Sequence, residues 1–171
     1  VERDKLLPGK DIKEGDAVLG IASSGLHSNG FSLVRYIVEQ QKLRYDTKAP
    51  FEPSKTLAQA LLEPTKIYVK SCLKALRAQK GIKAFAHITG GGLPENLPRV
   101  LPRHLAAEID TKAWKRPAVF EWLKQTGNIP DADFWRTFNA GIGMVAVTDK
   151  NTAESVADAL RAEGETVSII G

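Results

Sequence analysis

Residues 16–39, DAVLGIASSGLHSNGFSLVRYIVE, contain a strand, a polar corner and a helix in immediate succession. The short apolar run over residues 17–22 includes β-branched Val and Ile, which predicts a buried strand that ends at Ser23. Apolar side chains then recur at helical spacing after Gly30, which predicts an amphipathic helix that packs back on the sheet. The chain therefore turns from strand to helix through a short polar corner.

This first corner, residues 23–29, collects hydroxyl, amide and imidazole groups at the start of the helix. Free backbone N–H groups at a helix start bind anions, so we expect a ligand site here. Near neutral pH, His27 is able to donate to a phosphate or to act as a general acid or base. A capped turn fits the same residues equally well, with glycine supplying a positive φ. The candidate binding residues are Ser23, Ser24, Gly25, Ser28 and Asn29, with His27 as the catalytic candidate.

A second corner follows the strand predicted over residues 82–88. The glycine loop, Thr89-Gly90-Gly91-Gly92, lacks Cβ atoms at three consecutive positions, so its backbone amides are able to approach an oxyanion. Pro94 suits the first turn of a following helix that includes Asn96. A hinge or a ligand-free turn is the alternative. The spacing matches neither the dinucleotide fingerprint nor the Walker loop.

A third stretch, Asn139-Ala-Gly-Ile-Gly143, leads into a strand predicted over residues 142–147. Glycine at the start of a strand suggests the close approach of a ligand or of another backbone. A β-bulge is the competing interpretation. We include Asn139 among the candidate binding residues.

The order of strands and helices predicts an α/β domain over residues 16–171, with a mixed sheet of about five strands and helices packed against it. Residues 1–15 would form an incoming connection. The chain begins without Met and closes on a strand-like run, so we expect it to be cut from a longer protein. The other expected strands cover 105–110 and 166–170, and the other expected helices begin near Pro53, Pro64, Pro117, Asp131 and Asp149. Val69, Cys72, Leu73 and Leu76 would form the core-facing side of the helix after Pro64.

Composition excludes several classes of protein. With 171 residues, 43% of them hydrophobic, the chain is able to bury a proper core. No apolar window is long enough to cross a bilayer, and Val1 opens a charged segment, so a cytoplasmic protein is expected. The net charge of +4 is scattered, which argues against nucleic acid as a partner. Its single cysteine, Cys72, and its separated histidines give no metal site, and no nucleophile elbow is present.

Five motifs follow one another over nearly the whole chain: SSGLHSNGFSLVR (23–35), LEPTKIYVK (62–70), HITGGG (87–92), ENLPRVLP (95–102) and TFNAGIGM (137–144). Together they resemble the C-terminal half of the aminoimidazole ribonucleotide synthetase family, also called phosphoribosylformylglycinamidine cyclo-ligases. The resemblance implies ATP-dependent closure of the imidazole ring of formylglycinamidine ribonucleotide in purine synthesis, with magnesium assisting.

The same resemblance implies a partner. Family members are homodimers whose N-terminal halves hold most of the ATP and Mg²⁺ site, so this chain would be the C-terminal domain alone, inactive by itself and joined through residues 1–15. Its first corner would face the cleft between the halves, near the phosphorylated substrate. Gly90, Gly91 and Gly92, with Asn96, would bind an oxyanion. His27 would be the acid/base or phosphate-orienting residue of this cyclo-ligase reaction.

Two alternatives remain open. Related enzymes share the architecture, among them selenophosphate synthetase, thiamine monophosphate kinase and formylglycinamidine ribonucleotide synthetase. A docking module without catalysis is the second alternative, with an apolar surface that includes Trp114 and Trp135.

Overall fold

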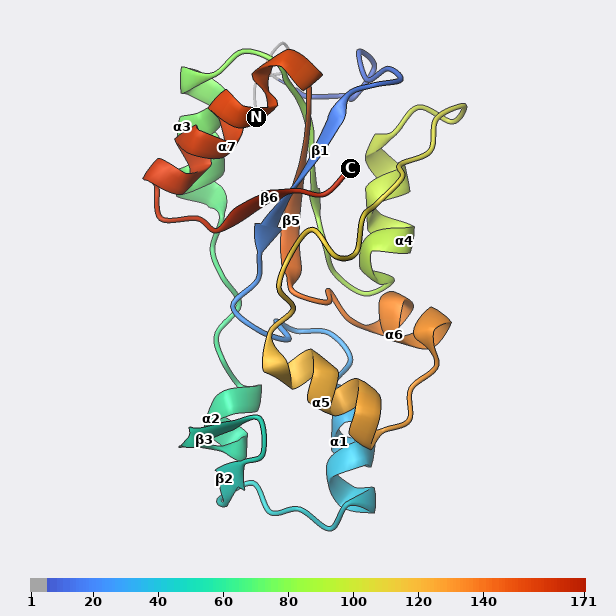
Figure 1. Ribbon diagram of the computed structural model, residues 1–171, viewed down its shortest axis with the longest axis vertical. Helices are drawn as coiled ribbons and strands as arrows, with labels where there is room; N and C mark the ends of the chain where they lie inside the picture. Colours follow the sequence, from blue (N-terminus) through green and yellow to red (C-terminus); the bar gives the residue numbers. More distant parts are fainter. Residues whose placement is uncertain (1–5) are drawn as a thin grey trace.

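A four-stranded sheet in the order β4-β5-β1-β6 forms the centre of the computed structural model, which describes residues 6–171 (Figure 1). Every neighbouring pair of strands in it is antiparallel. The predicted α/β class is confirmed, but the expected mixed sheet of about five strands is wrong. The strands are β1 (Ala17–Ala22), β4 (Ile82–His87), β5 (Ile142–Thr148) and β6 (Val167–Ile169).

The antiparallel arrangement arises because the helices between successive strands are not crossovers on one sheet. After β1 the chain leaves the sheet, builds a separate lobe and returns to the far edge as β4 (Figure 1). β5 then inserts between β4 and β1, and it runs opposite to both. As a result, the ends of β1 and β4 lie at the same end of the sheet as the beginning of β5.

Both faces of the sheet are covered. Helices α3 (Val69–Ala78) and α7 (Ala153–Ala162) pack on one face, around the buried Leu19, Ile21 and Val156. A 3-10 turn, η3 (Lys150–Thr152), precedes α7. The opposite face carries α4 (Gly92–Asn96), the 3-10 helix η2 (Leu97–Val100) and the segment that follows it (Figure 1).

The lobe has its own hydrophobic cluster, in which Phe120, Phe134 and Phe138 pack edge to face. Figure 1 shows it below the sheet, adjoining the end of β1 and the beginning of β5. The helices predicted after Gly30, Pro117 and near Asp131 are confirmed. The elements of this lobe are α1 (Phe31–Gln40), β2 (Lys48–Ala49), β3 (Glu52–Thr56), α2 (Leu57–Leu61), α5 (Ala118–Thr126) and α6 (Asp131–Thr137).

Two helix starts were predicted too early. Pro53 lies in β3, and α2 begins only after Thr56, whose side chain accepts from the backbone N–H of Gln59 in a capping box. This cap gives a stronger start than a proline alone. Residues 64–68 form neither helix nor strand, and α3 starts at Val69.

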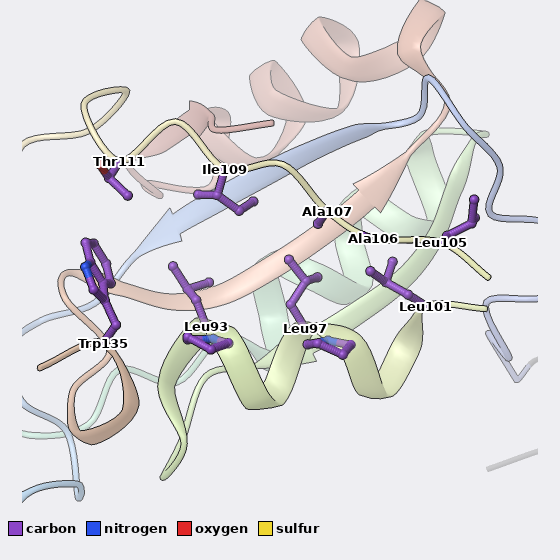
Figure 2. A pocket seen from close by; sticks show the side chains of 11 residues that line it. Leu93, Leu97, Leu101, Leu105, Ala106, Ala107, Ile109, Thr111 and Trp135 are labelled. Carbon is purple, nitrogen blue, oxygen red and sulfur yellow. The ribbon is translucent and has the colours of Figure 1, made fainter. Parts of the chain in front are cut away.

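The strand expected over residues 105–110 is absent. This segment pairs with the sheet only where the Asp110 N–H donates to the Ile170 carbonyl. Its side chains instead cover the sheet and line a groove of about 410 Å³. Figure 2 shows Ile109 opposite Leu93, and Leu105 close to Leu101. The apolar side chains of this segment therefore pack on a face of the sheet, and its backbone does not form a further strand. Of the connection expected over residues 1–15, residues 1–5 lie outside the described part.

Candidate functional site

The first corner and the glycine loop meet at one end of the sheet. The first corner follows β1, the glycine loop follows β4, and the residues before β5 lie between them. A Cβ placed on Gly90 would lie 3.7 Å from Oδ1 of Asn29, which puts the two corners in van der Waals range. The candidate residues of both corners thus form one neighbourhood, although 61 positions separate Asn29 from Gly90.

Asn139 holds the first corner from the side of β5. Its Nδ2 donates to the carbonyls of Gly25 (2.9 Å) and Leu26 (3.3 Å). Its Oδ1 accepts from the backbone N–H of Gly141 (2.8 Å) and lies 3.0 Å from Oγ of Ser23. Because the side chain is fully buried and every polar atom is engaged within the protein, these contacts give Asn139 a scaffolding role.

His27 is built into the same corner. The residue is only 5% exposed and has a φ of 57°, in the left-handed region. Its Nε2 accepts from the backbone N–H groups of Ser24 (3.2 Å) and Lys66 (3.4 Å), so the ring proton of the neutral imidazole is on Nδ1. Burial, followed by the charges of His87 and Lys66, lowers the pKa of His27 to about 4. His27 is therefore uncharged near neutral pH, and its catalytic role stays a prediction.

The irregular segment 64–68, for which the sequence predicts a helix, is a further part of this neighbourhood. Oγ of Ser24 donates to the Pro64 carbonyl (2.6 Å), and Oγ of Ser28 lies 3.3 Å from Oγ1 of Thr65. Nζ of Lys66 pairs with the buried carboxylate of Glu165 at 2.6 Å. These contacts lie within the motif LEPTKIYVK, whose proline predicts a helix start that the structure places later, at Val69.

Gly143 explains the unusual start of β5. The register between β1 and β5 shifts at this point, because Ile21 pairs with Met144 while Ala22 pairs with Ile142. The β-bulge interpretation is thereby confirmed. A Cβ on Gly143 would overlap the hydroxyl of Tyr68 and lie 2.6 Å from Cε1 of His27. The backbone at Gly143 is therefore also closely approached, by the side chains of Tyr68 and His27.

The glycine loop is held mainly from within. Nδ2 of Asn96 donates to the carbonyls of Thr89 (3.3 Å), Gly90 (3.1 Å) and Gly92 (2.8 Å). Oγ1 of Thr89 in turn lies 3.1 Å from Oδ1 of Asn96. As with Asn139, the buried amide organises backbone carbonyls, which places Asn96 beneath the loop rather than on its outer surface.

Only part of the loop presents its backbone donors as expected. The Gly91 N–H donates to the Arg136 carbonyl and the Gly92 N–H to the Thr89 carbonyl, both within the protein. Within residues 6–171, the N–H groups of Gly90 and of Gly30 have no hydrogen-bond partner. Two of the three glycine amides are thus already used within the protein, and Gly90 is the one glycine of the loop whose N–H has no partner among the described residues.

A polar cavity of about 420 Å³ opens beside the first corner. Ser24 and Gly25 form one wall, and the start of α5 forms another. Nζ of Lys55 lies 3.0 Å from carboxylate oxygens of both Glu52 and Glu63 at its rim. Polar ligands thus have a recess to enter next to the corner residues.

Within the described residues there is no group of three or more His, Cys, Asp or Glu side chains that could hold a metal ion. Over the same residues, no helix is both long and apolar enough to cross a bilayer. Burial raises the pKa of the Cys72 thiol to about 11, which agrees with the prediction of a buried small hydrophobe.

Comparison with known proteins agrees with the architecture. The chain is similar over its full length to the crystal structure of thiamine-monophosphate kinase from Stenotrophomonas maltophilia K279a, with a TM-score of 0.67 and 20% sequence identity. At that identity the likeness shows the fold. The chain spans about half of that protein, 51% of its length. Residues 13–171 match the family described as AIR synthase related protein, C-terminal domain, and the chain belongs to this family.

Proposed function

We propose that this chain is the C-terminal domain of an ATP-dependent phosphoribosylformylglycinamidine cyclo-ligase, a cytoplasmic homodimeric enzyme of purine synthesis. The complete enzyme would close the imidazole ring of formylglycinamidine ribonucleotide, releasing ADP and phosphate. ATP and Mg²⁺ would be held mostly by an N-terminal half, as the resemblance to the aminoimidazole ribonucleotide synthetase family implies.

The observation that carries this proposal is the meeting of the two corners. Asn29 and Gly90 lie in van der Waals range, and backbone donors of both corners, among them those of Gly30 and Gly90, have no partner within residues 6–171. Gly30 also precedes α1, a ten-residue helix whose dipole favours an anion at this end. Such an arrangement suits the phosphate of a ribonucleotide, and the five motifs favour the cyclo-ligase among related enzymes.

The residues of the neighbourhood divide into two roles in this proposal. Ser24, Ser28 and Asn29 have exposed or half-buried side chains, and they would contact the substrate. His27, whose imidazole stays neutral and accepts two backbone N–H groups, would hold the corner in shape and orient the phosphate rather than supply a proton. Asn96 and Asn139 would support the two corners from below.

An NMR titration of the 171-residue chain tests binding. Formylglycinamidine ribonucleotide should shift the amide signals of Gly30 and Gly90, and inorganic phosphate should shift the same signals at higher concentration. Unchanged signals at both positions at high ligand concentration would count against the proposal. Thiamine monophosphate is the matched competitor, because the chain shares its fold with a thiamine-monophosphate kinase; tighter binding of that compound would favour the kinase reaction instead.

The reaction itself requires the chain to be joined to an ATP-binding N-terminal half. We expect this two-domain protein to form aminoimidazole ribonucleotide and ADP together, and the isolated chain to form neither. Formation of thiamine diphosphate instead would contradict the cyclo-ligase assignment while keeping the family.

A further inference from the structure

A group of large apolar side chains faces solvent where α3 adjoins β4. Ile67, Val69 and Leu73 are 81%, 62% and 43% exposed. With the partly buried Leu76, Phe85 and Met144 they surround a cavity of about 480 Å³. We call these six residues the α3–β4 surface.

The α3–β4 surface arises because α3 uses its small residues for the core. Ser71, Cys72 and Ala75 are the buried positions of this helix, whereas Val69 and Leu73 point outward. The prediction that Val69 and Leu73 pack in the core is therefore wrong. An amphipathic helix with its larger apolar side chains in solvent is typical of a surface covered by another domain.

The strand beside this helix is also incompletely paired. β4 is the edge of the main sheet, and within residues 6–171 it pairs with β5 alone. Phe85 and Met144, from these two strands, form the floor of the cavity. Edge strands in natural proteins are usually covered, charged or interrupted. β4 carries one lysine, Lys83, whose charge is paired with Asp16, while Phe85 lines the cavity.

The α3–β4 surface is continuous with the candidate site. The hydroxyl of Tyr68 donates to the Ala22 carbonyl at the end of β1 (2.9 Å). The Tyr68 ring centroid lies 6.1 Å from that of His27 and 6.3 Å from that of His87, and both Tyr68 and His87 line the cavity. A partner seated on this surface would therefore adjoin the segment that holds the first corner.

We infer that the α3–β4 surface docks the N-terminal half of the two-domain protein to which this chain corresponds. The family match is to a C-terminal domain, and the chain covers 51% of the similar crystal structure, so a domain of similar size belongs beside it in this architecture. The inference rests on the proposed function for the existence of that half, and it adds where the half sits. Its contacting face would be apolar, to match Ile67, Val69 and Leu73.

Hydrogen–deuterium exchange tests the docking directly. The exchange rates of residues 66–76 and 82–87 are compared between the naturally expressed full-length protein and the 171-residue chain. We expect at least tenfold slower exchange of these segments in the full-length protein, and equal exchange over α1 in both. Equal exchange over the α3–β4 surface in the two proteins, or a naturally expressed protein no longer than this chain, would overturn the inference.

A pair of matched variants separates docking from stability. In the full-length protein, the double variant Ile67→Glu, Val69→Glu should restore the fast exchange of residues 82–87, because two carboxylates are costly to bury against an apolar partner. The control is Leu62→Glu, Tyr36→Glu, which alters two residues of similar exposure, 67% and 58%, in the lobe. Loss of protection in the control, or protection retained in the test variant, would contradict the assigned surface.

Two further readouts distinguish the outcomes. Sedimentation and hydrogen exchange at several protein concentrations would reveal a second copy as the occupant. If the full-length protein dissociates on dilution and exchange over the α3–β4 surface then becomes faster, the inferred occupant is wrong. Protection that persists on dilution would support the docking. If the same protein forms no aminoimidazole ribonucleotide, only the proposed cyclo-ligase reaction is contradicted, and the docking inference stands.

Discussion

The first corner and the glycine loop reach the same place by different means. In the glycine loop, Asn96 binds carbonyls four to seven positions earlier in the chain. In the first corner, Asn139 binds carbonyls more than 110 positions away, and His27 accepts from Lys66, 39 positions away. The side-chain hydrogen bonds of the glycine loop are local, with one backbone bond from Gly91 to Arg136, whereas those from Asn139 in the first corner exist only when the strands have been brought together.

This difference separates two kinds of stability. A local loop keeps its hydrogen bonds when distant elements loosen, whereas a long-range corner loses its shape together with the sheet. A ligand that bridges both corners would therefore bind most tightly to the fully folded domain. Substitutions in the two corners should be distinguishable by how far their effects spread.

Gly92→Ala should have the greatest effect, because it forces the glycine loop away from α6. A Cβ at Gly92 would overlap the carbonyl oxygen of Trp135 and lie 2.8 Å from that of Phe138, and the φ of 58° disfavours alanine. Since backbone atoms cannot rotate away, we expect a loss of about 4 kcal/mol in the free energy of unfolding. Urea denaturation measures it, and wild-type stability would mean that the loop does not pack on α6.

Asn139→Ala should follow, with a loss of about 3 kcal/mol, because several buried polar groups lose their partner at once. Asn96→Ala should cost less, about 2 kcal/mol, since its partners lie in a loop that water can reach. Amide hydrogen exchange distinguishes the two variants. Asn139→Ala should speed exchange over residues 23–26 and at Gly141, whereas Asn96→Ala should speed exchange only over residues 89–92. The reverse pattern would contradict the division into a local and a long-range corner.

His27→Gln should remove a pH dependence from the first corner. The pKa of His27 is lowered from 6.5 to about 4 in the folded chain, so the unfolded chain takes up a proton between these values and the folded chain does not. Stability is complete above pH 6.5 and falls toward pH 4, by at most about 1.4 kcal/mol per pH unit.

Denaturation at pH 7, 5.5 and 4.5 checks this expectation. The slope should be shallower in His27→Gln than in the wild type, and the exposed His104→Gln variant should keep the wild-type slope. An unchanged slope in His27→Gln would show that other groups cause the acid sensitivity.

Gly90→Ala should have the smallest effect on folding. The added Cβ would meet only Asn29 Oδ1, at the ordinary contact distance of 3.7 Å, so stability should change by less than about 1 kcal/mol. The same methyl group would narrow the space between Gly90 and Asn29, where we propose that the anion binds. We expect formylglycinamidine ribonucleotide to bind several-fold more weakly, by NMR titration, and unaltered affinity would remove Gly90 from the site.

Local sequence patterns predicted most of the elements. Apolar alternation or runs located β1, β4 and β5, and helical spacing located α1, α5 and α7. The same reasoning failed for residues 105–110, where apolar side chains cover a sheet face and the backbone forms no further strand, and at Pro53, where a capping box displaced the helix start. A pattern of alternation reports which side of a segment is buried, not which backbone it bonds to.

From the amino-acid sequence alone came the α/β class, the two corners, the glycine requirement near the start of β5 and the resemblance to the aminoimidazole ribonucleotide synthetase family. Each depends on residues within a few positions of one another. The fold was needed to show that every strand pair is antiparallel, that Asn139 and His27 hold the first corner, that two of three loop amides are already used, and that α3 turns Val69 and Leu73 outward. These features depend on contacts between residues distant in the chain, and no local pattern encodes which distant partner a buried group will meet.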